Sequence, residues 1–414
     1  MADGWRDTTL GEIVELKRGY DLPSRDRRCG PFPIISSSGV SGYHAEAKAK
    51  APGVVIGRYG TLGEVHYITK DYWPLNTSLY VRDFKGNDPR FVGYLLRCLD
   101  FQVYSDKAAV PGLNRNDLHK SRVRVPPLPQ QRAIAEILGA LDDKIELNRR
   151  MNETLEAMAR AIFKSWFVDF EPVRAKIDGR WRRGQSLPGL PADLYDLFPD
   201  SFEDSELGRI PRGWQVKALE QIAIFLNGLA LQKYPANGPE SLPVIKIAQL
   251  HNGDTKGADQ ASADLPTDYV IDDGEVLFSW SGSLEVVIWT GGRGALNQHL
   301  FRVTSSNQPK WFVFWWLREH LPHFRAIAAG KATTMGHIQR HHLSEAMVPV
   351  PPNPLLAAAT RVIEPLMQHA VANSVQNRTL AAIRDALLPK LISGELRVRE
   401  AGKPFTEKRL PHPV

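Results

Sequence analysis

The second half of this chain repeats the first half. The opening of the repeat recurs 209 positions further on, where Gly4, Trp5, Leu10, Ile13 and Gly19 return as Gly213, Trp214, Leu219, Ile222 and Gly228. The close recurs 225 positions further on, where Leu118, Val123, Val125, Pro126, Pro127 and Pro129 return as Leu343, Val348, Val350, Pro351, Pro352 and Pro354. A repeated segment folds as the same structural unit in each copy. The sequence therefore predicts two similar modules in a pseudo-twofold internal repeat.

The middle of each copy is rich in β-branched and aromatic residues. Here we align the copies at an offset of 221, so that Leu75-Asn76 and Leu79-Tyr80-Val81 correspond to Leu296-Asn297 and Leu300-Phe301, with Val303 beyond them. Strands are expected at 54–56, 65–68, 276–278 and 286–289, and short helices at 91–99 and 311–317. The fold class is therefore α/β or α+β.

A long helix is expected after each proline-rich close, because proline ends the preceding extended segment. The apolar seam of the first helix is Leu141, Ile145, Asn148, Asn152, Leu155, Ala159, Ile162 and Trp166. That of the second is Ile363, Leu366, Ala370, Asn373, Asn377, Leu380, Arg384, Leu387 and Leu391, with Ile383 as a substitute for Arg384. Asparagines in a seam fix helix register. We expect an antiparallel coiled coil set by Asn148, Asn152, Asn373 and Asn377; two amphipathic helices on a globular core are the alternative.

These patterns divide the chain into four parts. Residues 1–130 and 206–350 are the two modules, 131–205 is a central helical spacer with a linker, and 351–414 is a distal helical spacer with a tail. Residues 171–207 are rich in proline, glycine and charge, which is typical of a linker or a docking segment. A helix over 138–166 would span roughly 40 Å, comparable to one turn of duplex DNA at about 34 Å.

Composition narrows the partners and the compartment. A net charge of +6 and a pI near 9.2 favour polyanions. Cys29 and Cys98 lie outside any metal-ligand or disulfide pattern, so a reducing compartment is expected. The chain begins without a signal-like leader, and the apolar stretch Trp311–Leu317 is far shorter than the roughly 20 residues of a membrane span. We expect a soluble, cytoplasmic protein without membrane association.

No catalytic, cofactor or metal site is predicted. The glycines of residues 57–63 are spaced GxxGxxG, which is neither a dinucleotide nor a P-loop pattern. Ser281-Gly282-Ser283 is not a nucleophile elbow. His337 and His341 lack a completing ligand set, and the acidic pairs at 142–143 and 272–273 are expected on solvated faces. The chain is therefore predicted not to be an enzyme.

Direct reading of DNA needs Arg, Lys, Asn or Gln at base edges, with further donors on phosphates. Candidates in the first module are Arg58, Tyr59, Asn76, Thr77, Ser78, Lys107, Asn114 and Arg115. Candidates in the second module are Ser279, Trp280, Ser281, Asn297, Gln298, His299, Lys331, Thr333, Thr334 and His337. Residues 1–125 hold 19 basic and 14 acidic side chains, whereas residues 205–350 hold 13 of each. Affinity for DNA from this chain alone is therefore expected to be modest and salt-dependent.

Two variable modules that open with Gly-Trp and close with VPPLP or VPVPP before a long helix resemble the DNA specificity subunit of type I restriction-modification systems. The first helix start, PPLPQQR at 126–132 with LDDKIELN at 141–148, is similar to that family's central helix, and LPKLISGEL at 388–396 is similar to its distal helix. The resemblance implies two target-recognition domains, each reading half of an asymmetric bipartite site, and a helix pair that acts as a ruler between them.

The same resemblance implies partners for the helices. Two modification subunits would dock there, bind S-adenosylmethionine and methylate adenine, and an ATP-dependent restriction and translocation subunit would join them. The second helix start, PPNPL at 351–355, lacks the Gln-Gln-Arg of the first, which implies less conventional docking there. Two alternatives stay open. One is a coiled-coil interaction scaffold that does not read DNA, and the other is a fused methyltransferase or nuclease enzyme.

Overall fold

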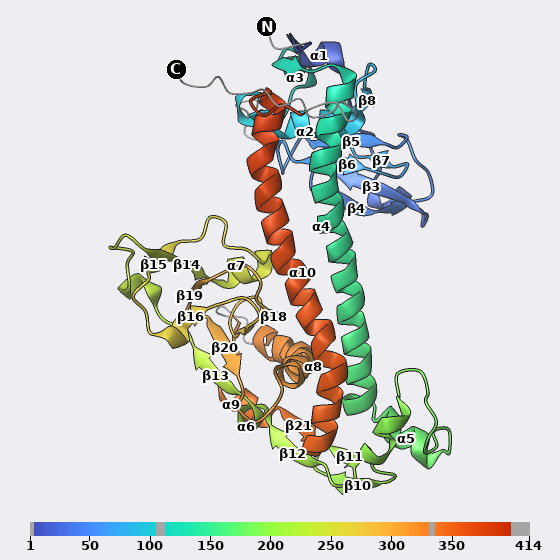
Figure 1. The fold of residues 1–414 in the computed structure, drawn as a ribbon, viewed down its shortest axis with the longest axis vertical. Coiled ribbons are helices and arrows are strands. Elements are labelled where there is room, and N and C mark those ends of the chain that lie inside the picture. Colours follow the sequence, from blue (N-terminus) through green and yellow to red (C-terminus); the bar gives the residue numbers. More distant parts are fainter. Residues whose placement is uncertain (1–3, 105–111, 331–335, 399–414) are drawn as a thin grey trace, which may run out of the picture. The chain divides into compact units, whose positions relative to one another are not determined.

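The computed structural model describes residues 4–104, 112–330 and 336–398, which belong to two compact units (Figure 1). Unit 1 consists of Met1–Lys144 and Leu380–Val414, and unit 2 of Ile145–Thr379. Each unit contains one repeat module and one end of each of two long helices. We call residues 4–127 module 1 and residues 213–352 module 2. The four-part division made from the sequence stays a prediction.

Module 1 is built from short strands and three helices. The strands are β1 (Arg6–Thr9), β2 (Glu15–Arg18), β3 (Phe32–Ser36), β4 (Gly39–His44), β5 (Gly53–Gly57), β6 (Val65–Ile68), β7 (Trp73–Pro74), β8 (Ser78–Asp83) and β9 (Arg122–Val125). The helices are α1 (Leu10–Ile13), α2 (Pro89–Arg97) and α3 (Arg115–His119), with 3-10 turns η1 (Ser24–Asp26) and η2 (Phe101–Tyr104). One sheet has the order β2-β8-β5-β6, a second has the order β4-β3-β7, and β1 pairs with β9.

Module 2 repeats this arrangement. Its strands are β12 (Gln215–Ala218), β13 (Ile224–Asn227), β14 (Ser241–Ile245), β15 (Gln260–Ser262), β16 (Val270–Ile271), β17 (Val276–Ser279), β18 (Val286–Ile288), β19 (Gly294–Leu296), β20 (Leu300–Thr304) and β21 (Met347–Val350). Its helices are α6 (Leu219–Ile222), α7 (Ile247–Asn252), α8 (Lys310–Ala329) and α9 (His341–Glu345), with 3-10 turns η5 (Leu231–Lys233) and η6 (Thr267–Tyr269).

The two modules share most of one topology, and module 2 adds the edge strand β16 to its second sheet, whose order is β15-β14-β19-β16. The order β13-β20-β17-β18 matches β2-β8-β5-β6 strand for strand, and the parallel pair β14-β19 matches the parallel pair β3-β7. The pair β12-β21 matches β1-β9, so the Gly-Trp opening and the proline-rich close meet in both copies. The predictions of a mixed helix and sheet fold and of a repeated module are therefore confirmed.

Local chemistry explains where the helices of module 1 begin. The Asp88 carboxylate accepts a hydrogen bond from the Phe91 amide over 2.9 Å, and Pro89 occupies the first turn of α2. At the start of the long helix α4 (Leu128–Phe163), the buried Gln131 side chain donates to Pro126 O and to Asn87 Oδ1, both over 2.9 Å. The Gln131 side chain thus closes the strand-to-helix corner, which gives it a structural role.

The long helices α4 and α10 (Asn353–Ser393) pack against each other in antiparallel fashion within each unit. In unit 1, Arg384 Nη1 on α10 donates to Asp142 Oδ1 on α4 over 2.8 Å, while Ile383 is 44% exposed. The expectation that Ile383 would replace Arg384 in the seam is wrong, because the ion pair with Asp142 accommodates the arginine there. In unit 2 the helix interface carries the four asparagines described below.

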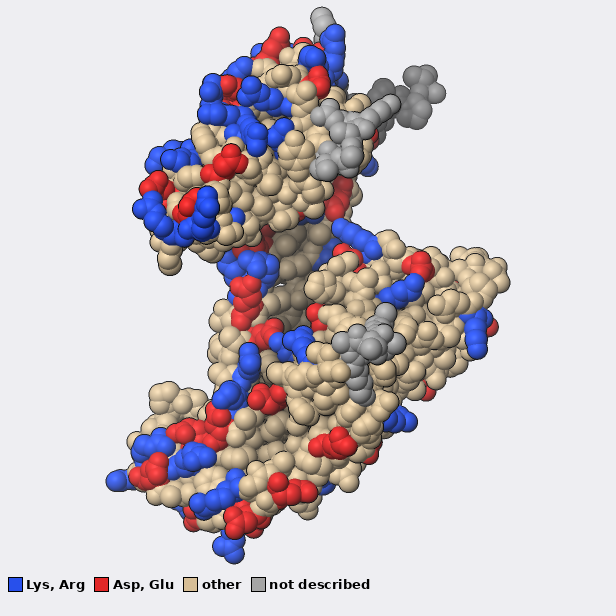
Figure 2. Space-filling model, turned by 180° about the vertical axis from the view of Figure 1, so that it is seen from behind, with Lys and Arg blue, Asp and Glu red and all other residues tan. Residues whose placement is uncertain are grey.

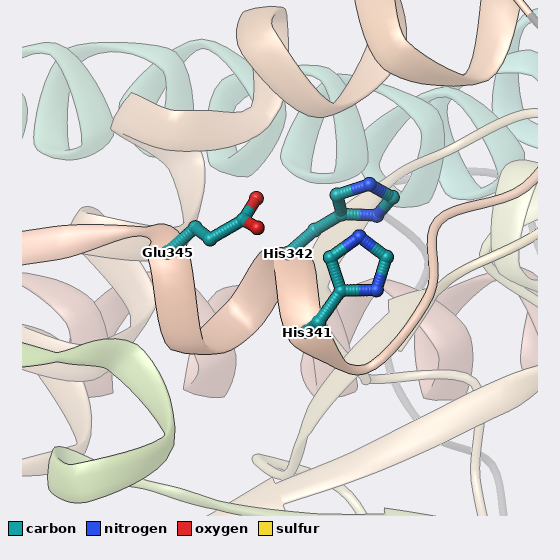
Figure 3. Close-up of side chains that lie close together, drawn as sticks. All are labelled: His341, His342 and Glu345. Atoms are coloured by element: carbon teal, nitrogen blue, oxygen red, sulfur yellow. The ribbon is translucent and has the colours of Figure 1, made fainter.

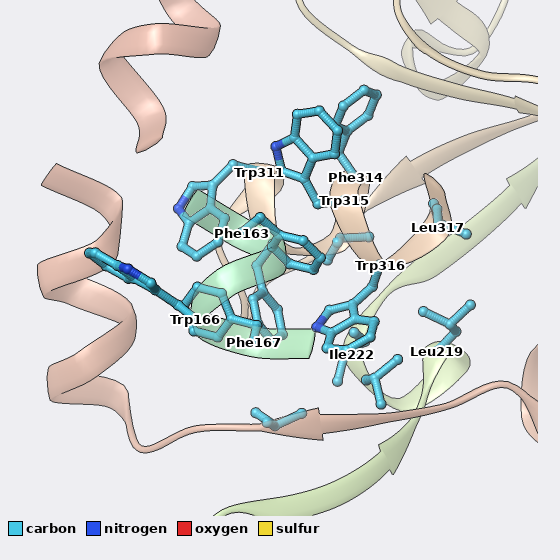
Figure 4. Close-up of a cluster of buried hydrophobic side chains, with 14 of the residues drawn as sticks. Phe163, Trp166, Phe167, Leu219, Ile222, Trp311, Phe314, Trp315, Trp316 and Leu317 are labelled. Carbon is cyan, nitrogen blue, oxygen red and sulfur yellow. The ribbon is translucent and has the colours of Figure 1, made fainter. Parts of the chain in front are cut away.

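An aromatic core fills unit 2 (Figure 4). Phe163 lies at the end of α4, and its ring centroid is 5.2 Å from that of Trp316 on α8. The chain continues through a π-helical turn, η3 (Lys164–Val168), which contributes Trp166 and Phe167 to the same core. Burial of these large aromatic side chains contributes to the stability of this unit.

The segment 171–207, expected to be a linker or a docking segment, is folded onto this core. It forms α5 (Glu171–Ile177), the 3-10 helix η4 (Ala192–Leu197) and the hairpin of β10 (Phe202–Ser205) with β11 (Gly208–Pro211). Trp181 is 1% exposed, and its ring lies 5.0 Å from that of Tyr195 and 6.1 Å from that of Phe198. Tryptophan and phenylalanine in a proline- and glycine-rich stretch are the signal that could have predicted this packing.

Among the described residues, no helix combines the length and the apolar character that a bilayer crossing requires.

Candidate nucleic-acid interface

In module 1, two turns that carry predicted DNA-binding residues lie side by side. Arg58 and Tyr59 directly follow β5, and their backbone amides both donate to Thr77 O, over 3.0 and 3.2 Å. Thr77 and Asn76 directly precede β8, which is the neighbour of β5 in the sheet. The ends of adjacent antiparallel strands meet at one sheet edge, so this pairing follows from the topology.

A third segment closes the same edge. Leu113 N donates to Arg58 O over 3.1 Å, and Arg58 Nε donates to Leu113 O over 3.3 Å. The Arg58 guanidinium lies 4.5 Å from the centroid of the Tyr59 ring, a cation–π distance. A Cβ at position 112 would lie 2.4 Å from the Tyr59 ring, so Gly112 provides the space for this side chain.

The remaining candidates of module 1 have different environments. Asn76 Nδ2 donates to the carboxylate of the exposed Asp21, a neighbour that sequence reasoning missed. Asn114 Oδ1 accepts from Asn116 N over 2.9 Å and caps α3, so its side chain has a structural role, while Arg115 is exposed. Lys107 lies outside the described residues.

Module 2 brings its candidates together at the corresponding edge. Trp280 directly follows β17. Its ring centroid lies 5.9 Å from that of His299 and 6.3 Å from that of His337. The backbone carbonyl of Trp280 accepts a hydrogen bond from Ile338 N over 3.0 Å. Ser281 forms a β-bridge with His337. The equivalent third segment therefore reaches the site in both modules.

Hydrogen bonds fix the side chains of this second cluster. Trp280 Nε1 donates to Asn227 Oδ1 over 2.9 Å and to Gln298 O over 3.2 Å. Ser281 Oγ lies 3.1 Å from His299 Nδ1, and Gln298 Nε2 lies 3.4 Å from His299 Nε2. Sequence reasoning missed Asn227, because its position at the end of β13 becomes relevant only once β13, β20 and β17 are adjacent.

The backbone hydrogen bonds at this site show that the sequence alignment of the two modules is wrong by one residue. Four backbone hydrogen bonds of module 1 have a counterpart in module 2. Arg58 N to Thr77 O matches Trp280 N to His299 O, and Asn76 N to Tyr20 O matches Gln298 N to Leu229 O. Leu75 N to Ile35 O matches Asn297 N to Ile245 O, and Ser78 N to Leu75 O matches Leu300 N to Asn297 O. Each pair places the site residues 222 positions apart, so the offset of 221 is wrong by one. Asn76 therefore corresponds to Gln298, and Thr77 to His299.

A one-residue slip in a strand moves each side chain to the opposite face. It explains why Asn297, the counterpart of the buried Leu75, is only 3% exposed. Ser78 and Ser279 are 0% exposed, and their hydroxyls donate to Leu75 O over 2.8 Å and to Ser283 O over 2.6 Å. Asn297, Ser78 and Ser279 are therefore corrected from DNA-contacting to internal residues, because their polar atoms are turned into the module.

The other candidates of module 2 are only partly covered by the structure. Trp280, Gln298, His299 and His337 are half-buried, which leaves part of each side chain at the surface. Lys331, Thr333 and Thr334 lie outside the described residues.

The four seam asparagines lie on the interface between α4 and α10 in unit 2. Asn148 Nδ2 donates to Asn377 Oδ1 over 2.9 Å, and Asn373 Nδ2 donates to Asn152 Oδ1 over 3.0 Å. Asn152 Nδ2 also donates to Ala370 O. Asn148 is fully buried and Asn373 is 6% exposed. Whether these contacts set the helix register stays a prediction.

The acidic pairs at 142–143 and 272–273 were expected on solvated faces; Asp143 and Asp272 are exposed, whereas Asp142 and Asp273 are half-buried and ion-paired. Asp142 accepts from Tyr94 OH over 2.7 Å as well as from Arg384. Burial alone would raise the pKa of Asp142, but hydrogen bonds from Tyr94 and Arg384 outweigh it and hold the pKa below its usual range. Asp273 accepts two hydrogen bonds from Arg378 on α10, over 2.8 and 2.6 Å.

One group of side chains in the described part of the chain has metal-ligand spacing: His341, His342 and Glu345 (Figure 3). Their ligand atoms lie within 4.8 Å of one another. His342 Nδ1 accepts from Gln339 N over 2.9 Å and is therefore engaged within the protein. His337 lies apart from this group, in the cluster around Trp280. We assign no metal to these residues, because the backbone amide of Gln339 already occupies His342 Nδ1.

Surface charge differs between the modules, as the sequence predicts. Lys and Arg side chains gather in several groups on module 1 (Figure 2). Some of them are already paired, as Arg28 is with Glu46 and Lys50 with Asp71. Phosphate contacts would compete with these exposed pairs, which are weak in water.

Three comparisons with known proteins complete the description of the site. The family model of the type I restriction modification DNA specificity domain matches residues 2–157 and 211–354. The chain is 27% identical over 356 residues to the type I restriction enzyme MjaIX specificity subunit of Methanocaldococcus jannaschii, with 79% of this chain and 74% of that protein covered. It is 25% identical over 338 residues to the HindI specificity subunit of Haemophilus influenzae, with coverages of 70% and 72%.

The fold is also similar to a solved structure. The S subunit of a type I restriction-modification system from M. genitalium superposes with a TM-score of 0.58 at 15% identity, with 94% of this chain and 96% of that chain covered. This likeness supports the fold of two modules with two long helices.

Proposed function

The chain belongs to the type I restriction modification DNA specificity family, and from this premise we propose that it is the non-catalytic subunit that reads an asymmetric, bipartite DNA site. Each module would read one half-site. The chain would act in the cytoplasm on double-stranded DNA, and bind neither S-adenosylmethionine nor ATP itself.

The observation that carries the proposal is the equivalence of the two polar edges. The same backbone hydrogen bonds hold Arg58 and Thr77 in module 1 and Trp280 and His299 in module 2. The two frames share these backbone hydrogen bonds, whereas the side chains that they present differ in size, charge and hydrogen-bonding pattern. One frame with two sets of side chains supports two readers of different base sequences.

The half-buried and exposed residues of these edges are the proposed DNA contacts. They are Arg58, Tyr59, Asn76, Thr77 and Arg115 in module 1, and Trp280, Gln298, His299 and His337 in module 2. Lys107, Lys331 and Thr333 remain predicted contacts. Because residues 205–350 hold equal numbers of basic and acidic side chains, the grip of this module on phosphates would depend on partner subunits.

We propose that the helices dock two methyltransferase subunits, which bind S-adenosylmethionine and recruit an ATP-dependent restriction subunit. Exposed apolar side chains on α4 support this: Leu147 and Met158 in unit 2 are 53% and 48% exposed, and Ile137 in unit 1 is 39% exposed. Large apolar side chains on the outside of a helix pair are suited to burial by partner helices.

Module exchange tests this function. Residues 206–350 are replaced with the corresponding module of a relative that has a different target, and the DNA motif of the complex is determined. We expect one half-site to change while the other half-site stays the same. An unchanged motif would mean that module 2 does not read DNA, and a wild-type complex that binds its partner but no DNA would favour an interaction scaffold.

The proposed ruler has its own test. One heptad is inserted into α4 between Lys144 and Ile145 and one into α10 between Thr379 and Leu380. The gap tolerated between half-sites should change while both half-site sequences persist. An unchanged gap in a folded variant would contradict the ruler.

A further inference from the structure

Asn76 and Gln298 occupy the same place in the two modules. The Asn76 backbone amide donates to Tyr20 O over 3.1 Å, and the Gln298 backbone amide donates to Leu229 O over 2.9 Å. Both residues sit in the turn that enters the central strand pair, β8 with β5 and β20 with β17. Their side chains therefore leave the backbone from equivalent points, which the one-residue error in the sequence alignment had hidden.

A close backbone approach holds each of these turns in place. A Cβ on Gly19 would lie 2.1 Å from Leu75 O, and a Cβ on Gly228 would lie 2.2 Å from Asn297 O. Only glycine permits this contact, so the carbonyl before each amide residue is pressed against the preceding strand. Asn76 and Gln298 are thus presented from a rigid support, which is the condition for reading a base.

At this edge, the amide is the chemical group that the two modules share. Two further equivalent pairs at this edge, Arg58 with Trp280 and Thr77 with His299, differ in their chemistry. The Asn76 and Gln298 side chains are half-buried, so neither is a core residue. A shared group within an otherwise varied edge indicates an element of the target that both half-sites share.

The amide groups have the donor and acceptor that one base requires. Their described contacts use the amide nitrogen, from Asn76 Nδ2 to Asp21 and from Gln298 Nε2 to His299. That nitrogen carries two hydrogens and the amide oxygen has two lone pairs. In the major groove, adenine presents an N6 donor beside an N7 acceptor, and Asn or Gln pairs with both at once.

On the basis of the proposed function, we propose that Asn76 and Gln298 are the adenine-reading residues of module 1 and module 2. Each contacts N6 and N7 of one adenine in its own half-site through the major groove. The residues that differ between the modules, such as Arg58 and Trp280, read or exclude the neighbouring bases.

The first test is selection from a random duplex DNA library by the full chain in complex with its methyltransferase partner. Asn76→Ala should relax one A·T position in one half-site, and Gln298→Ala one A·T position in the other, each with a loss of roughly 10- to 100-fold in preference. Matched controls are Gln102→Ala in module 1 and Asn252→Ala in module 2, since both are exposed amides outside the turns that carry Asn76 and Gln298. The controls should leave every position unchanged.

A second variant gives a result that loss of folding cannot imitate. Gln298→Glu keeps the shape of the side chain and replaces the amide donor with an acceptor, and carboxylates accept from N4 of cytosine. The preferred base at the affected position should move from adenine to cytosine, while the other half-site stays the same. A structural role for Gln298 would change affinity without changing the preferred base.

Failure of the adenine assignment can be distinguished from failure of the proposed function. If the wild-type complex selects a bipartite motif and both alanine variants select the same motif, the adenine assignment is overturned and the proposed function stands. If the wild-type complex selects no motif, the proposed function fails and the assignment fails with it.

Discussion

The side-chain amide nitrogen of Asn148 on α4 donates to the side-chain oxygen Oδ1 of Asn377 on α10, 2.9 Å away. Its repeat-related counterpart runs in the opposite sense, from Asn373 Nδ2 to Asn152 Oδ1 over 3.0 Å. The backbone contacts follow the same rule, since Asn377 donates to Ile145 O and Asn152 to Ala370 O. The sequence repeat is thus expressed as a local twofold hydrogen-bond exchange inside unit 2.

This exchange predicts a measurable cost for Asn148→Ala. Asn148 is fully buried and donates to both Gln376 and Asn377. Removing it loses two hydrogen bonds, to the half-buried Asn377 and the exposed Gln376, at a cost of about 1–3 kcal/mol for the two together in the free energy of unfolding. Urea denaturation measures the difference. Gln368→Ala, an exposed site on α10, is the control and should change stability by less than about 0.5 kcal/mol; equal effects of the two variants would contradict the argument.

The ion pair between Asp142 and Arg384 predicts a pH-dependent effect. Because the pKa of Asp142 is held below its usual range in the folded state, its stabilisation is complete above the unfolded pKa of about 3.9 and is lost as pH falls through the lower folded pKa. Asp142→Asn should therefore destabilise the protein at pH 7, with a difference that persists to about pH 5 and shrinks in stronger acid.

Asp385→Asn is the matched control for this effect. Asp385 also accepts from Arg384, over 2.7 and 2.9 Å, but its side chain is 48% exposed. An exposed pair contributes about 0–1 kcal/mol, so this variant should be nearly neutral at pH 7. A difference between Asp142→Asn and wild type that is the same at every pH would show that the charge is not its cause.

The glycine contacts predict paired effects in the two modules. Gly19→Ala and Gly228→Ala each place a methyl group against a backbone carbonyl, at 2.1 and 2.2 Å, and should cost about 1–3 kcal/mol. Gly19→Ala should weaken reading of one half-site and Gly228→Ala reading of the other, as measured by competition binding with half-site mutants. Gly238→Ala, whose nearest contact would be at 4.0 Å, should affect neither. Loss of both half-sites from either single variant would argue against independent modules.

Trp280→Phe isolates the hydrogen bonds of the indole. The phenyl ring keeps the packing on Phe301, whereas the donor to Asn227 Oδ1 and Gln298 O is lost. We expect altered base preference in the half-site read by module 2, with an unchanged salt dependence of binding because no charge is removed. A change in the salt dependence, measured by DNA-binding titrations at several ionic strengths, would contradict this role.

Much of the fold could be predicted, because it follows from short patterns with a direct physical meaning. The proline-rich closes end strands β9 and β21, the heptad seams form α4 and α10, and the Gly-Trp openings mark the start of both modules. The position of the site could also be predicted in part, since Arg58, Tyr59 and Thr77 meet at one edge.

The exact correspondence of residues between the modules and the long-range ion pairs could not be predicted from the single sequence. The offset of 221 matched Asn76 to Asn297 by residue type, whereas the hydrogen bonds match Asn76 to Gln298. Asp142 and Asp273 looked like solvated charges because their partners, Arg384 and Arg378, are far away in the sequence. Long-range ion pairs and one-residue register shifts become visible only in three dimensions.

The central claim is that two modules of one chain read two halves of one DNA site. The most direct measurement is the DNA motif selected by the wild-type chain in complex with its methyltransferase partner, determined by sequencing the bound duplexes. A gapped motif with two unrelated half-sites is the predicted result. A single continuous motif, or no motif from a complex that is intact, would contradict the claim.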